Sequence, residues 1–528
     1  MAKTDGFAGV QIPRSPVYGT RGMVVSGHSL ASLAGLRVLE RGGSMVDAMI
    51  ACSAALSVVV PHATSLGGDA FILYHRAGDG RTLGMNASGH APAGASLGLY
   101  ADGIPKRGAL AFSVPGMIRG WERMHQRYGN LPWADLFADA AALAEAHPLS
   151  RVLAGALNLF REDVEGDPGC REIYYPDGKP LPAGALVRQP ALARSVGLIA
   201  EGGSAAFYEG GIAKSIAASA QAQGGVVTPD DFAGYEPEWV EPLESGYRGL
   251  SVRVMPPNSY GVLMLMQLNA LDGIDPAELG GDEARRLACL MRAQRAAFAA
   301  GRQYIADPRT DPAPVDRLLS DETTRALCDE VRGAAEPAPA MAHPAGGTSC
   351  IAIADGEGNG ISVVQSVFHV FGSAFLDPGT GILMNNRMTG FSIDADSANA
   401  LAPGKRPAHT LNPVAVLDAG RLRYLMTTPG GPSQTLSHVQ ILNNLVDRGM
   451  ELTAAIDAPR WSINMQGETL LDEAFDGDVA DRLAGAGFPV KRAAGASYFG
   501  SAKTIEVTGD GVLLGAADTR REAYAVGA

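Results

Sequence analysis

The first ninety residues contain segments of helical and of strand-like hydrophobic periodicity. Between residues 30 and 40, apolar residues recur every three or four positions with arginine and glutamate between them, which predicts an amphipathic helix ending at a Gly-Gly pair. Residues 46–60 are apolar on nearly every side, so we expect a buried helix there. Two apolar runs, 70–75 and 82–87, flank Ala-Gly-Asp-Gly and predict a β-hairpin.

Helical patterns dominate the middle of the chain, and strand patterns dominate its last third. Helices are expected within residues 116–223, 282–303 and 314–330, with a strand at 247–255. The proline- and alanine-rich tract 336–347 has no periodicity and is interpreted as an exposed linker. Beyond it, strands are expected at 349–354, 361–367, 414–417, 422–426, 504–507 and 512–514, and a helix at 437–447. Helices alternating with antiparallel hairpins predict stacked helix and sheet layers.

Composition narrows the class of protein. Of the 528 residues, 46% are apolar and 19% charged, which is sufficient for a large core and argues against disorder. The 43 basic and 56 acidic residues give a net charge of −13, without a basic run that could follow a phosphate backbone. Nucleic acid is therefore not expected as a partner.

Membrane and redox signals point to a cytoplasmic protein. The longest apolar stretch, residues 49–60, is too short to span a bilayer, and residues 1–20 lack the apolar region of a secretory signal. The five cysteines are scattered and form no Cys-x-x-Cys motif. Neither a membrane partner, a disulfide framework nor a zinc site is expected.

Two familiar motifs are matched only in part. Gly-His-Ser-Leu-Ala at residues 27–31 approaches a nucleophile elbow, but Ala31 replaces the final glycine and only one strand precedes it. The expected role of Ser26 or Ser29 is instead to cap the following helix. The many Gly-Gly pairs are not followed by the Lys-Ser/Thr of a phosphate loop, and the ten histidines form no ligand spacing. We expect neither a metal nor another cofactor.

A third motif, Gly-Gly-Thr-Ser-Cys at residues 346–350, joins the linker to an apolar strand. Cleavage between Gly347 and Thr348 would give Thr348 a free α-amine beside its own hydroxyl. The amine, with an ordinary pKa of about 7.7–8.0, can accept the hydroxyl proton near neutral pH, so one residue would supply both nucleophile and base. Because threonine begins many strands after loops, spacing alone does not distinguish a catalytic threonine from a structural one.

Longer motifs make the chain recognisable. After the linker these are GTSCIAIADGEGNGISVVQSVFHVFGS, GTGILMNNRMTGF, PGKRP, TLNP, TTPGGPSQT and DAPRW. Before it these are MVVSGHSLASLAGLRVLERGGSMVDAMIA, VVPHATSLGGDAFIL, SVPGMIRGW and GGVVTPDDFAGYEPEWVEPLESGYRGLSVRVMPPNS. Taken in chain order, these motifs resemble those of the γ-glutamyltranspeptidases (glutathione hydrolases), from about residue 23 to about residue 507.

The resemblance implies an α+β fold, the four-layer αββα sandwich of the N-terminal-nucleophile hydrolases. It implies self-cleavage into a large subunit, residues 1–347, and a small subunit, residues 348–528, which fold as one unit and remain associated as a heterodimer. Thr348 would be the nucleophile in both self-cleavage and amide cleavage. The Gly430-Gly431 pair would supply oxyanion-hole amides, and Ser366 stands where the family has a threonine bonded to the nucleophile.

The glutamyl pocket of the family is not retained. Ser88 stands at the position of the arginine that binds the substrate carboxylate, and Gly390 at that of the aspartate that binds the substrate ammonium. The remaining pocket positions are occupied by Phe368, Arg387, His409 and Thr410, and by Asn385 and Asn386, whose role is structural or substrate-binding. The segment 391–406 is shorter than the lid loop of the family.

An arginine in place of an ammonium-binding group favours an acyl substituent that carries a carboxylate and no amine. Arg387, with His409, could hold such a carboxylate. We therefore expect an amidohydrolase acting on a small acid-amide, of the oxamate amidohydrolase type. The alternatives are a γ-glutamyl transferase or glutathione hydrolase, an acylase acting on glutaryl-type β-lactams, and a non-catalytic relative.

Overall fold

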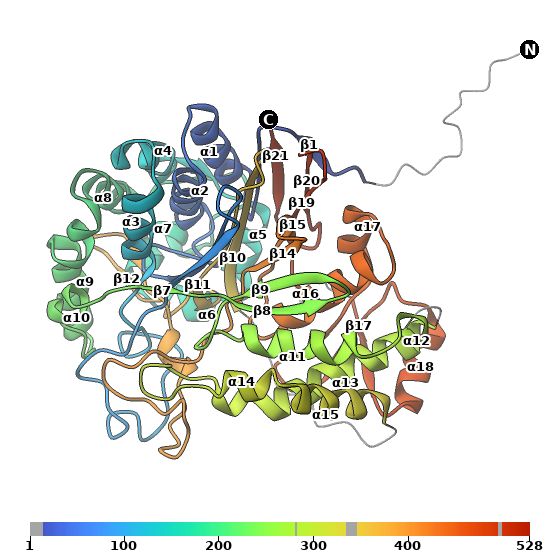
Figure 1. Cartoon of the computed structure of the whole chain (residues 1–528). Helices are drawn as coiled ribbons and strands as arrows, with labels where there is room; N and C mark the ends of the chain where they lie inside the picture. Colours follow the sequence, from blue (N-terminus) through green and yellow to red (C-terminus); the bar gives the residue numbers. More distant parts are fainter. Residues whose placement is uncertain (1–13, 280–281, 334–345, 495–498) are drawn as a thin grey trace, which may run out of the picture.

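Two seven-stranded sheets lie face to face between two layers of helices (Figure 1). The computed structural model describes residues 14–279, 282–333, 346–494 and 499–528. The predicted four-layer αββα sandwich is confirmed. The linker predicted at 336–347 falls mostly outside the described residues, and its last two residues begin a strand.

The first sheet has the order β21-β2-β10-β11-β3-β4-β7, and all its neighbours are antiparallel. Its strands are β2 (Gly22–Ser26), β3 (Asp69–Arg76), β4 (Arg81–Ala87), β7 (Glu238–Val240), β10 (Gly346–Asp355), β11 (Gly360–His369) and β21 (Tyr524–Gly527). Strands β2, β3, β4 and β7 precede residue 347, β11 and β21 follow it, and β10 contains it, so this sheet is built from both halves of the chain.

The second sheet has the order β1-β20-β19-β15-β14-β9-β8 and again combines both halves. Its strands are β1 (Val17–Gly19), β8 (Leu243–Tyr247), β9 (Leu250–Val254), β14 (Val414–Asp418), β15 (Arg421–Thr427), β19 (Lys503–Val507) and β20 (Leu513–Ala517). Shorter strands are β5 (His147–Pro148), β6 (Leu186–Val187), β12 (Leu376–Asp377), β13 (Ile382–Leu383), β16 (Trp461–Ile463), β17 (Thr469–Asp472) and β18 (Val490–Ala493).

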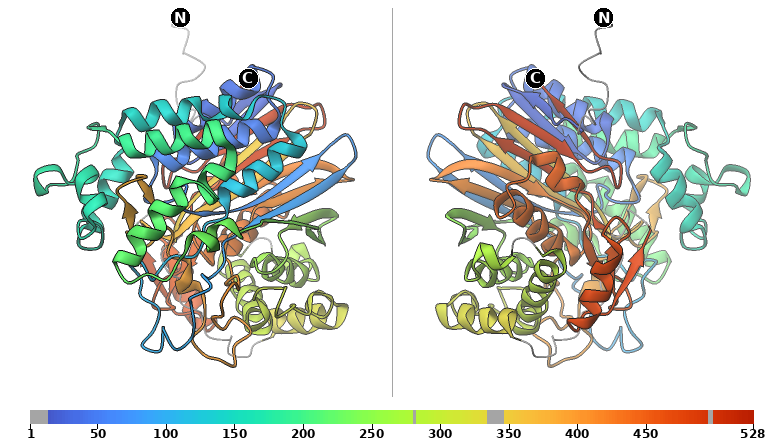
Figure 2. Two further views of the ribbon diagram at one scale, coloured as in Figure 1. Left: turned by 90° about the vertical axis from the view of Figure 1, so that its left-hand side faces the viewer. Right: turned by 90° about the vertical axis from the view of Figure 1, so that its right-hand side faces the viewer.

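Helices from the first half of the chain cover the outer face of the first sheet (Figure 2). They include α1 (Ser29–Glu40), α2 (Met45–Val59), α3 (Met117–Tyr128), α4 (Ala138–Glu145), α8 (Pro190–Tyr208) and α9 (Gly211–Ala222). Every residue of α2 is buried, as its pattern of apolar residues on nearly every side predicts. The alternation of each strand directs Ile351 and Ile353 of β10 into this helical layer.

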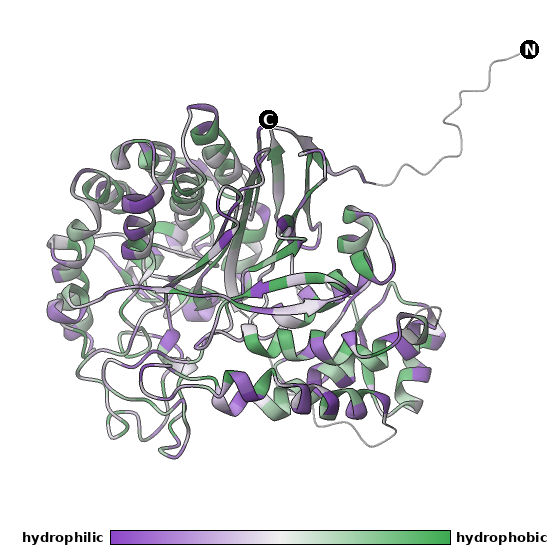
Figure 3. Cartoon of the chain, in the orientation of Figure 1, coloured by the Kyte–Doolittle hydropathy of each residue, from purple (hydrophilic) through white to green (hydrophobic). Residues whose placement is uncertain are grey.

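The second sheet is covered by α11 (Gly261–Asp272), α13 (Glu283–Gly301), α15 (Asp321–Arg332) and α16 (Ser433–Val446). Between the two sheets lies a separate apolar layer, in which Ala352 and Ala354 of β10 meet Ala415, Leu417 and Leu425 of the second sheet. Figure 3 shows hydrophobic residues along these central strands and hydrophilic ones at the periphery. The remaining helices are α5 (Arg151–Leu159), α6 (Arg161–Val164), α7 (Pro168–Tyr174), α10 (Pro229–Ala233), α12 (Pro276–Leu279), α14 (Val315–Leu318), α17 (Leu452–Asp457) and α18 (Gly477–Gly485).

Three local predictions are corrected. The expected single strand at 247–255 is the second half of a hairpin, because Arg248 and Gly249 both adopt positive φ and reverse the chain between β8 and β9. Helix α1 is capped by His28, whose Nδ1 accepts the Leu30 amide at 3.3 Å, and not by Ser26 or Ser29. The helical pattern at 314–330 forms two helices, α14 and α15.

Candidate active site

Thr348 is the third residue of β10, which runs without interruption through the Gly347–Thr348 bond of the uncut chain. A register shift against β11 falls between these two residues. Thr348 lies two residues before Cys350, whose side chain packs between the sheets, so the threonine points toward the second sheet. Only 6% of Thr348 is exposed. The motif at 346–350 therefore forms the first half of β10, and its Thr348 side chain faces the second sheet.

Ser366 links Thr348 to the peptide bond that precedes it. Its hydroxyl lies 3.2 Å from Thr348 Oγ1 and donates a hydrogen bond of 2.5 Å to the carbonyl oxygen of Gly347. The amide of Phe368 donates to the same hydroxyl at 2.7 Å. Because the Ser366 hydroxyl donates its only proton to Gly347, it accepts the hydrogen bond from the Thr348 hydroxyl. Ser366 is thus the donor in one hydrogen bond and the acceptor in two. Ser366 thus orients the threonine hydroxyl and polarises the adjacent carbonyl.

The Gly430-Gly431 pair lies beside the same bond. Both residues have positive φ, +137° and +56°, which glycine adopts without a steric penalty. The Gly431 nitrogen would lie 3.2 Å from a Cβ placed on Gly346, so its amide is close to the chain just before Thr348. Helix α16 begins two residues later, and its N-terminal end favours negative charge.

Gly347 is held in a space that admits no side chain. A Cβ there would lie 2.5 Å from the His369 carbonyl oxygen and 2.7 Å from that of His62. Burial lowers the pKa of His62 to about 3, with smaller contributions from Arg521 and His28, so its imidazole is neutral at neutral pH. The close packing fixes the position of the bond before Thr348.

A second group of polar residues lies on the β11 side of Thr348. Ser366 pairs across the sheet with Asp69, the first residue of β3. The Asp69 carboxylate lies 3.4 Å from Arg387 Nε and 3.3 Å from His409 Nε2. The Arg387 guanidinium stacks on the ring of Phe368, 4.0 Å from its centre. Arg387, Phe368 and His409, predicted from separate motifs, are thus in one cluster.

Arg387 is fully buried, yet its terminal nitrogens Nη1 and Nη2 have no hydrogen-bond partner among the described residues. Burial lowers the pKa of the guanidinium to about 10, and Asp69 opposes this shift, so the charge persists at neutral pH. Unpaired buried donors are costly, particularly on a charged group. The two nitrogens are therefore suited to an anionic ligand.

His409 is turned toward Asp69. Its Nε2 faces the carboxylate, and its Nδ1 accepts the Leu411 amide at 3.4 Å. Burial lowers the pKa of His409 to about 4, and the charge of Arg387 adds to the effect. A neutral ring with both nitrogens engaged holds Asp69 in place, which differs from the two-point carboxylate clamp expected of His409 and Arg387.

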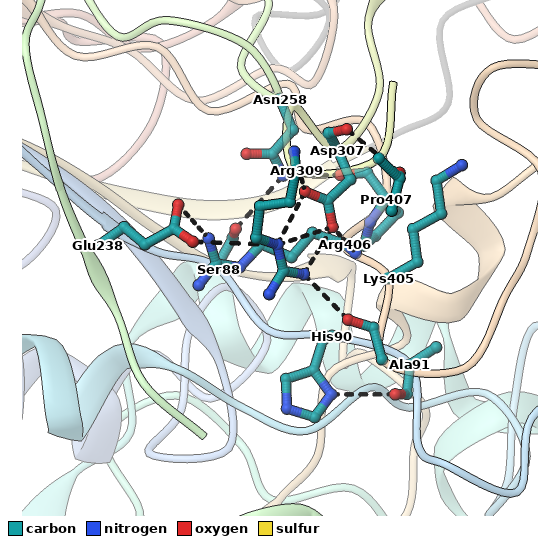
Figure 4. Close-up of polar contacts among 12 residues, drawn as sticks. Ser88, His90, Ala91, Glu238, Asn258, Asp307, Arg309, Lys405, Arg406 and Pro407 are labelled. Atoms are coloured by element: carbon teal, nitrogen blue, oxygen red, sulfur yellow. Dashed lines mark hydrogen bonds and ion pairs between the residues drawn. The ribbon is translucent and has the colours of Figure 1, made fainter. Parts of the chain in front are cut away.

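Ser88 is buried and engaged within the protein. Its hydroxyl donates to Asn86 Oδ1 at 2.6 Å and accepts from Asn258 Nδ2 at 3.3 Å. Figure 4 shows Ser88 beside the network in which Arg309 and the Arg406 amide bind the buried carboxylate of Asp307. The Asn258 amide also donates to the Pro407 carbonyl at 2.8 Å, which ties this network to the PGKRP motif.

The neighbouring predicted residues are also bonded within the protein. Asn386 accepts the His369 amide at 2.9 Å and donates to the Lys106 carbonyl at 3.0 Å. Asn385 likewise accepts a hydrogen bond from the Ser113 amide and donates one to the Gly67 carbonyl. Thr410 is buried beside His409, and Gly390 leaves room for the stem of Arg387, which would lie 3.6 Å from a Cβ at 390.

A cavity of about 610 Å³ opens beside Thr348, Gly347 and Gly430. Its walls include Val152, Ala156, Leu159 and Phe160 of the α5 region and Ile463 and Met465 after α17, and its charged residues are Lys503, Arg520, Arg521 and Glu522. The described lining does not include Asp69, Arg387 or His409. The nucleophile position is thus flanked by two chemically different regions.

Several residues of the site were missed by sequence reasoning. Asp69 is the lone acidic residue before the apolar run 70–73, a pattern that signals a buried, paired charge. His62 lies within a motif that was recognised, but only the fold places it against Gly347. Lys503 also begins an apolar strand, where a lone cation could have been noted.

Within the described ranges, no group of three or more His, Cys, Asp or Glu side chains is arranged to hold a metal ion. The helices of the same ranges include none with the length and apolar character needed to cross a membrane.

Comparisons with known proteins place the site in context. The family model described as gamma-glutamyltranspeptidase matches residues 31–528. A glutathione hydrolase-like proenzyme, YwrD of Bacillus subtilis, is 36% identical over 526 residues, covering 97% of this chain and 99% of the relative. The oxamate amidohydrolase proenzyme of Klebsiella pneumoniae is 33% identical over 524 residues, covering 96% and 98%. The crystal structure of cephalosporin acylase from Bacillus halodurans superposes with a TM-score of 0.91 at 32% identity, covering 100% and 99%.

Proposed function

Because this chain belongs to the gamma-glutamyltranspeptidase family of amide-cleaving N-terminal-nucleophile hydrolases, we propose that it cuts itself before Thr348 and then hydrolyses amides of a small acyl group bearing a carboxylate. Oxamate, which yields oxalate and ammonia, is the smallest substrate of this kind. The cut divides the chain into residues 1–347 and 348–528, which remain together as a heterodimer.

Self-cleavage begins with attack of Thr348 Oγ1 on the Gly347 carbonyl carbon. The carbonyl oxygen, already bonded by Ser366 at 2.5 Å, gains negative charge in the transition state, where a fixed donor is most effective. The C–N bond then breaks and its nitrogen takes the hydroxyl proton, which leaves an ester between Gly347 and Thr348. Water hydrolyses this ester to a Gly347 carboxylate and a free Thr348 amine and hydroxyl.

The free amine converts Thr348 into the nucleophile for substrate. It accepts the Oγ1 proton as the hydroxyl attacks the substrate carbonyl, and the amide groups of Gly430 and Gly431 stabilise the oxyanion. The leaving amine takes a proton, and an acyl-enzyme remains. Water attacks this ester in the same way, releases the acid and restores Thr348.

The proposal of a carboxylate-bearing acyl group depends on Arg387. Its buried terminal nitrogens have no protein hydrogen-bond partner among the described residues, and a guanidinium binds a carboxylate through two parallel hydrogen bonds. The Phe368 ring against one face leaves little room for a long acyl chain. The role proposed for Asp69 and His409 is to hold the guanidinium in place. An acyl group that carries an ammonium would be repelled by the charge of Arg387.

A second candidate is an acylase that accepts a longer dicarboxylic acyl group, such as glutaryl, from a bulky amine. The cavity of about 610 Å³ beside Thr348 favours it, because ammonia needs no such volume. A γ-glutamyl hydrolase or transferase remains a third reading of the family. A non-catalytic relative would be expected to lose the nucleophile first, and Thr348 is retained.

A denaturing gel tests the nucleophile. We expect the purified protein to run as fragments of about 36 and 19 kDa, in proportion to 347 and 181 residues of a 54.7 kDa chain, and Thr348→Ala to remain as one band. Thr348→Ser, which keeps a hydroxyl, should still be cut. An uncut wild-type chain would favour the non-catalytic alternative.

An acyl panel tests the substrate assignment. Processed enzyme is assayed with oxamate, glutaryl anilide and γ-glutamyl anilide, and release of each acid is measured. We expect turnover of oxamate and little of the γ-glutamyl compound, whereas turnover of glutaryl anilide above that of oxamate would favour the second candidate. A kcat/KM for γ-glutamyl anilide equal to or above that of oxamate and glutaryl anilide would exclude the proposed acyl group.

A further inference from the structure

We infer that Lys503 is a positioning residue for this reaction, whose buried ammonium lies beside Thr348 and keeps the freed Thr348 amine unprotonated at neutral pH. The inference rests on the proposed function, because that amine exists only after the cut. The amine must accept the hydroxyl proton of Thr348, and an amine that is already protonated cannot do so. Lys503 would thus prepare the base of the reaction.

The alternation of two facing strands brings Lys503 toward Thr348. Ala352 of β10 and Ile505 of β19 belong to the same apolar layer between the sheets. Side chains on one face of a strand recur at every second residue, so Cys350 and Thr348 share the face of Ala352. By the same rule Lys503 shares the face of Ile505. The Lys503 ammonium and the Cys350 thiol each influence the pKa of the other, as expected of neighbours.

The ammonium of Lys503 is fixed inside the protein. Lys503 is 2% exposed and lines the cavity of about 610 Å³ together with Thr348 and Gly430. Its Nζ donates to the Ser501 carbonyl at 2.7 Å and to the Ser501 hydroxyl at 3.0 Å. Both acceptors are neutral oxygens, so they hold the ammonium in place without cancelling its charge.

The segment that carries Lys503 also supports the oxyanion loop. Lys503 pairs with Thr427, at the end of β15 just before this loop. The Ser501 amide donates to Thr428 Oγ1 at 3.2 Å, and this hydroxyl donates to the Pro429 carbonyl at 3.1 Å. A purely structural role of Lys503 would act through these contacts, so its charge and its hydrogen bonds need separate tests.

The charged groups around Lys503 are mostly positive. One carboxylate, Asp518, acts on Lys503, together with the cations Arg460 and Arg521 and the thiol of Cys350. Burial raises the pKa of Cys350 to about 11, so the thiol is neutral at neutral pH. The Asp518 carboxylate bonds Arg460 and also acts on Arg521, so it is shared among several cations.

The other ionisable residues of the cavity do not reverse this balance. Glu522 is the one carboxylate of the described lining, which also contains three cations. Burial raises the pKa of Glu522, and its Oε2 has no hydrogen-bond partner among the described residues. Arg520 is paired with Asp472 at 3.2 Å, and burial lowers the pKa of His62 to about 3, so that ring is uncharged. A proton added to the Thr348 amine would therefore be repelled more than attracted.

Lys503 keeps its charge at the pH where the amine must be free. Burial lowers the pKa of the Lys503 ammonium to about 8. An N-terminal amine has an ordinary pKa of about 7.7–8.0, and a neighbouring cation lowers it by about one unit. At neutral pH Lys503 is thus protonated while most of the Thr348 amine is basic.

The amine can be titrated directly in the processed wild-type protein. With ¹⁵N-threonine labelling, the cut converts the Thr348 nitrogen from an amide into an amine, whose NMR resonance stands apart from the amides. We expect its pKa to lie about one unit below the ordinary 7.7–8.0. A value at or above about 7.7 would overturn the inference. An uncut chain would overturn this inference and the proposed function together, whereas failure of the acyl panel leaves the titration readable.

Two variants separate the charge of Lys503 from its hydrogen bonds. Lys503→Gln removes the charge, and Ser501→Ala removes one hydrogen bond and keeps the charge. The acid limb of the pH profile of kcat/KM reports the base of the free enzyme, and it is measured with the panel compound that the wild type turns over fastest. Lys503→Gln should move this limb upward by about one pH unit, with about a tenfold loss at pH 6 and less than about twofold at pH 9. Ser501→Ala should leave the limb in place.

Two further variants control for charge. Lys503→Arg restores the cation and should return the limb to the wild-type pH. Lys214→Gln, at an exposed position of α9 outside the described lining, makes the same change in net charge and should leave the limb unchanged. An equal loss of kcat/KM at every pH for Lys503→Gln would show a structural role and overturn the inference. If Lys503→Gln does not fold, the wild-type titration decides alone.

Discussion

The hydroxyl of Ser366 donates a hydrogen bond of 2.5 Å to the carbonyl oxygen of Gly347 and lies 3.2 Å from Thr348 Oγ1. One side chain thus contacts both the proposed nucleophile and the carbonyl that it attacks in self-cleavage. In the uncut chain the fold thus places Ser366 against two of the groups that take part in the proposed self-cleavage.

Removing the Ser366 hydroxyl should slow self-cleavage. Loss of one fixed oxyanion donor typically costs about 10²–10³ in rate, so Ser366→Ala is expected to accumulate the full-length chain. Ser366→Thr retains the hydroxyl and should be cut at close to the normal rate. The measurement is a time course on denaturing gels after synthesis of the unlabelled chain in a cell-free system. Cleavage of the alanine variant at the wild-type rate would contradict this role.

Adding a methyl group at Gly347 should displace the bond to be cut. Its Cβ would lie 2.5 and 2.7 Å from two carbonyl oxygens of His369 and His62, so the backbone must move. We expect Gly347→Ala to lose about 1–3 kcal/mol of unfolding free energy and to be cut much more slowly. Gly78→Ala, in a turn with open space around its Cβ, is the matched control for both measurements. Wild-type cleavage by Gly347→Ala would show that the close contacts are not required.

Arg387 and Asp69 are expected to be coupled in stability but not in substrate selection. Arg387→Gln leaves the buried carboxylate without its cationic partner and should cost about 3–5 kcal/mol in urea unfolding. The double variant Asp69→Asn/Arg387→Gln should recover most of that stability. Its kcat/KM for carboxylate-bearing acyl groups should still be lower by about 100-fold, because the guanidinium is absent. Retention of the wild-type acyl preference by the double variant would exclude Arg387 as the carboxylate-binding residue.

Acidification should destabilise the fold through its buried histidines. Burial lowers the pKa of His409 to about 4, and that of His62 and of His438 to about 3, against an ordinary value near 6.5. Below pH 6.5 the unfolded chain binds protons that the folded chain does not. The stability is therefore complete above pH 6.5 and falls by about 1.4 kcal/mol per histidine for each pH unit below it, until the folded pKa is reached.

His438 provides the control for this pH dependence. Both of its ring nitrogens are buried without a hydrogen-bond partner among the described residues, so leucine can replace it without breaking a bond. Urea unfolding between pH 7 and 5 should show a shallower loss of stability for His438→Leu than for the wild type. Parallel pH profiles for the two proteins would contradict the shifted pKa.

Sequence patterns were most reliable where one local signal determined the structure. The largely apolar helix α2 and the strands on either side of Asp418-Ala419-Gly420 are predicted nearly to the residue. The β8–β9 hairpin was missed because its turn residue Arg248 is not one that ordinarily adopts positive φ. Because the turn signal is weak, the sequence predicts one strand where the structure has two.

The site was predictable in its residues but not in their pairing. Thr348, Ser366 and Gly430 could be identified from motifs, whereas Asp69, which contacts both Arg387 and His409, lies more than 300 residues before them in sequence. Only the pairing of β3 with β11 brings Asp69 beside this cluster. The expected role of His409 changed for the same reason, since its partner lies on another strand.

The combination in each sheet of strands from before and after residue 347 has a practical consequence for anyone handling this protein. In the first sheet β2 pairs with β10 and β21, and β3 pairs with β11, so hydrogen-bonded ladders still join the two fragments after a cut before Thr348. An affinity tag at either terminus should retrieve both fragments, and gel filtration should give the same elution volume before and after processing. A library screened only for soluble expression would therefore retain variants that have never matured.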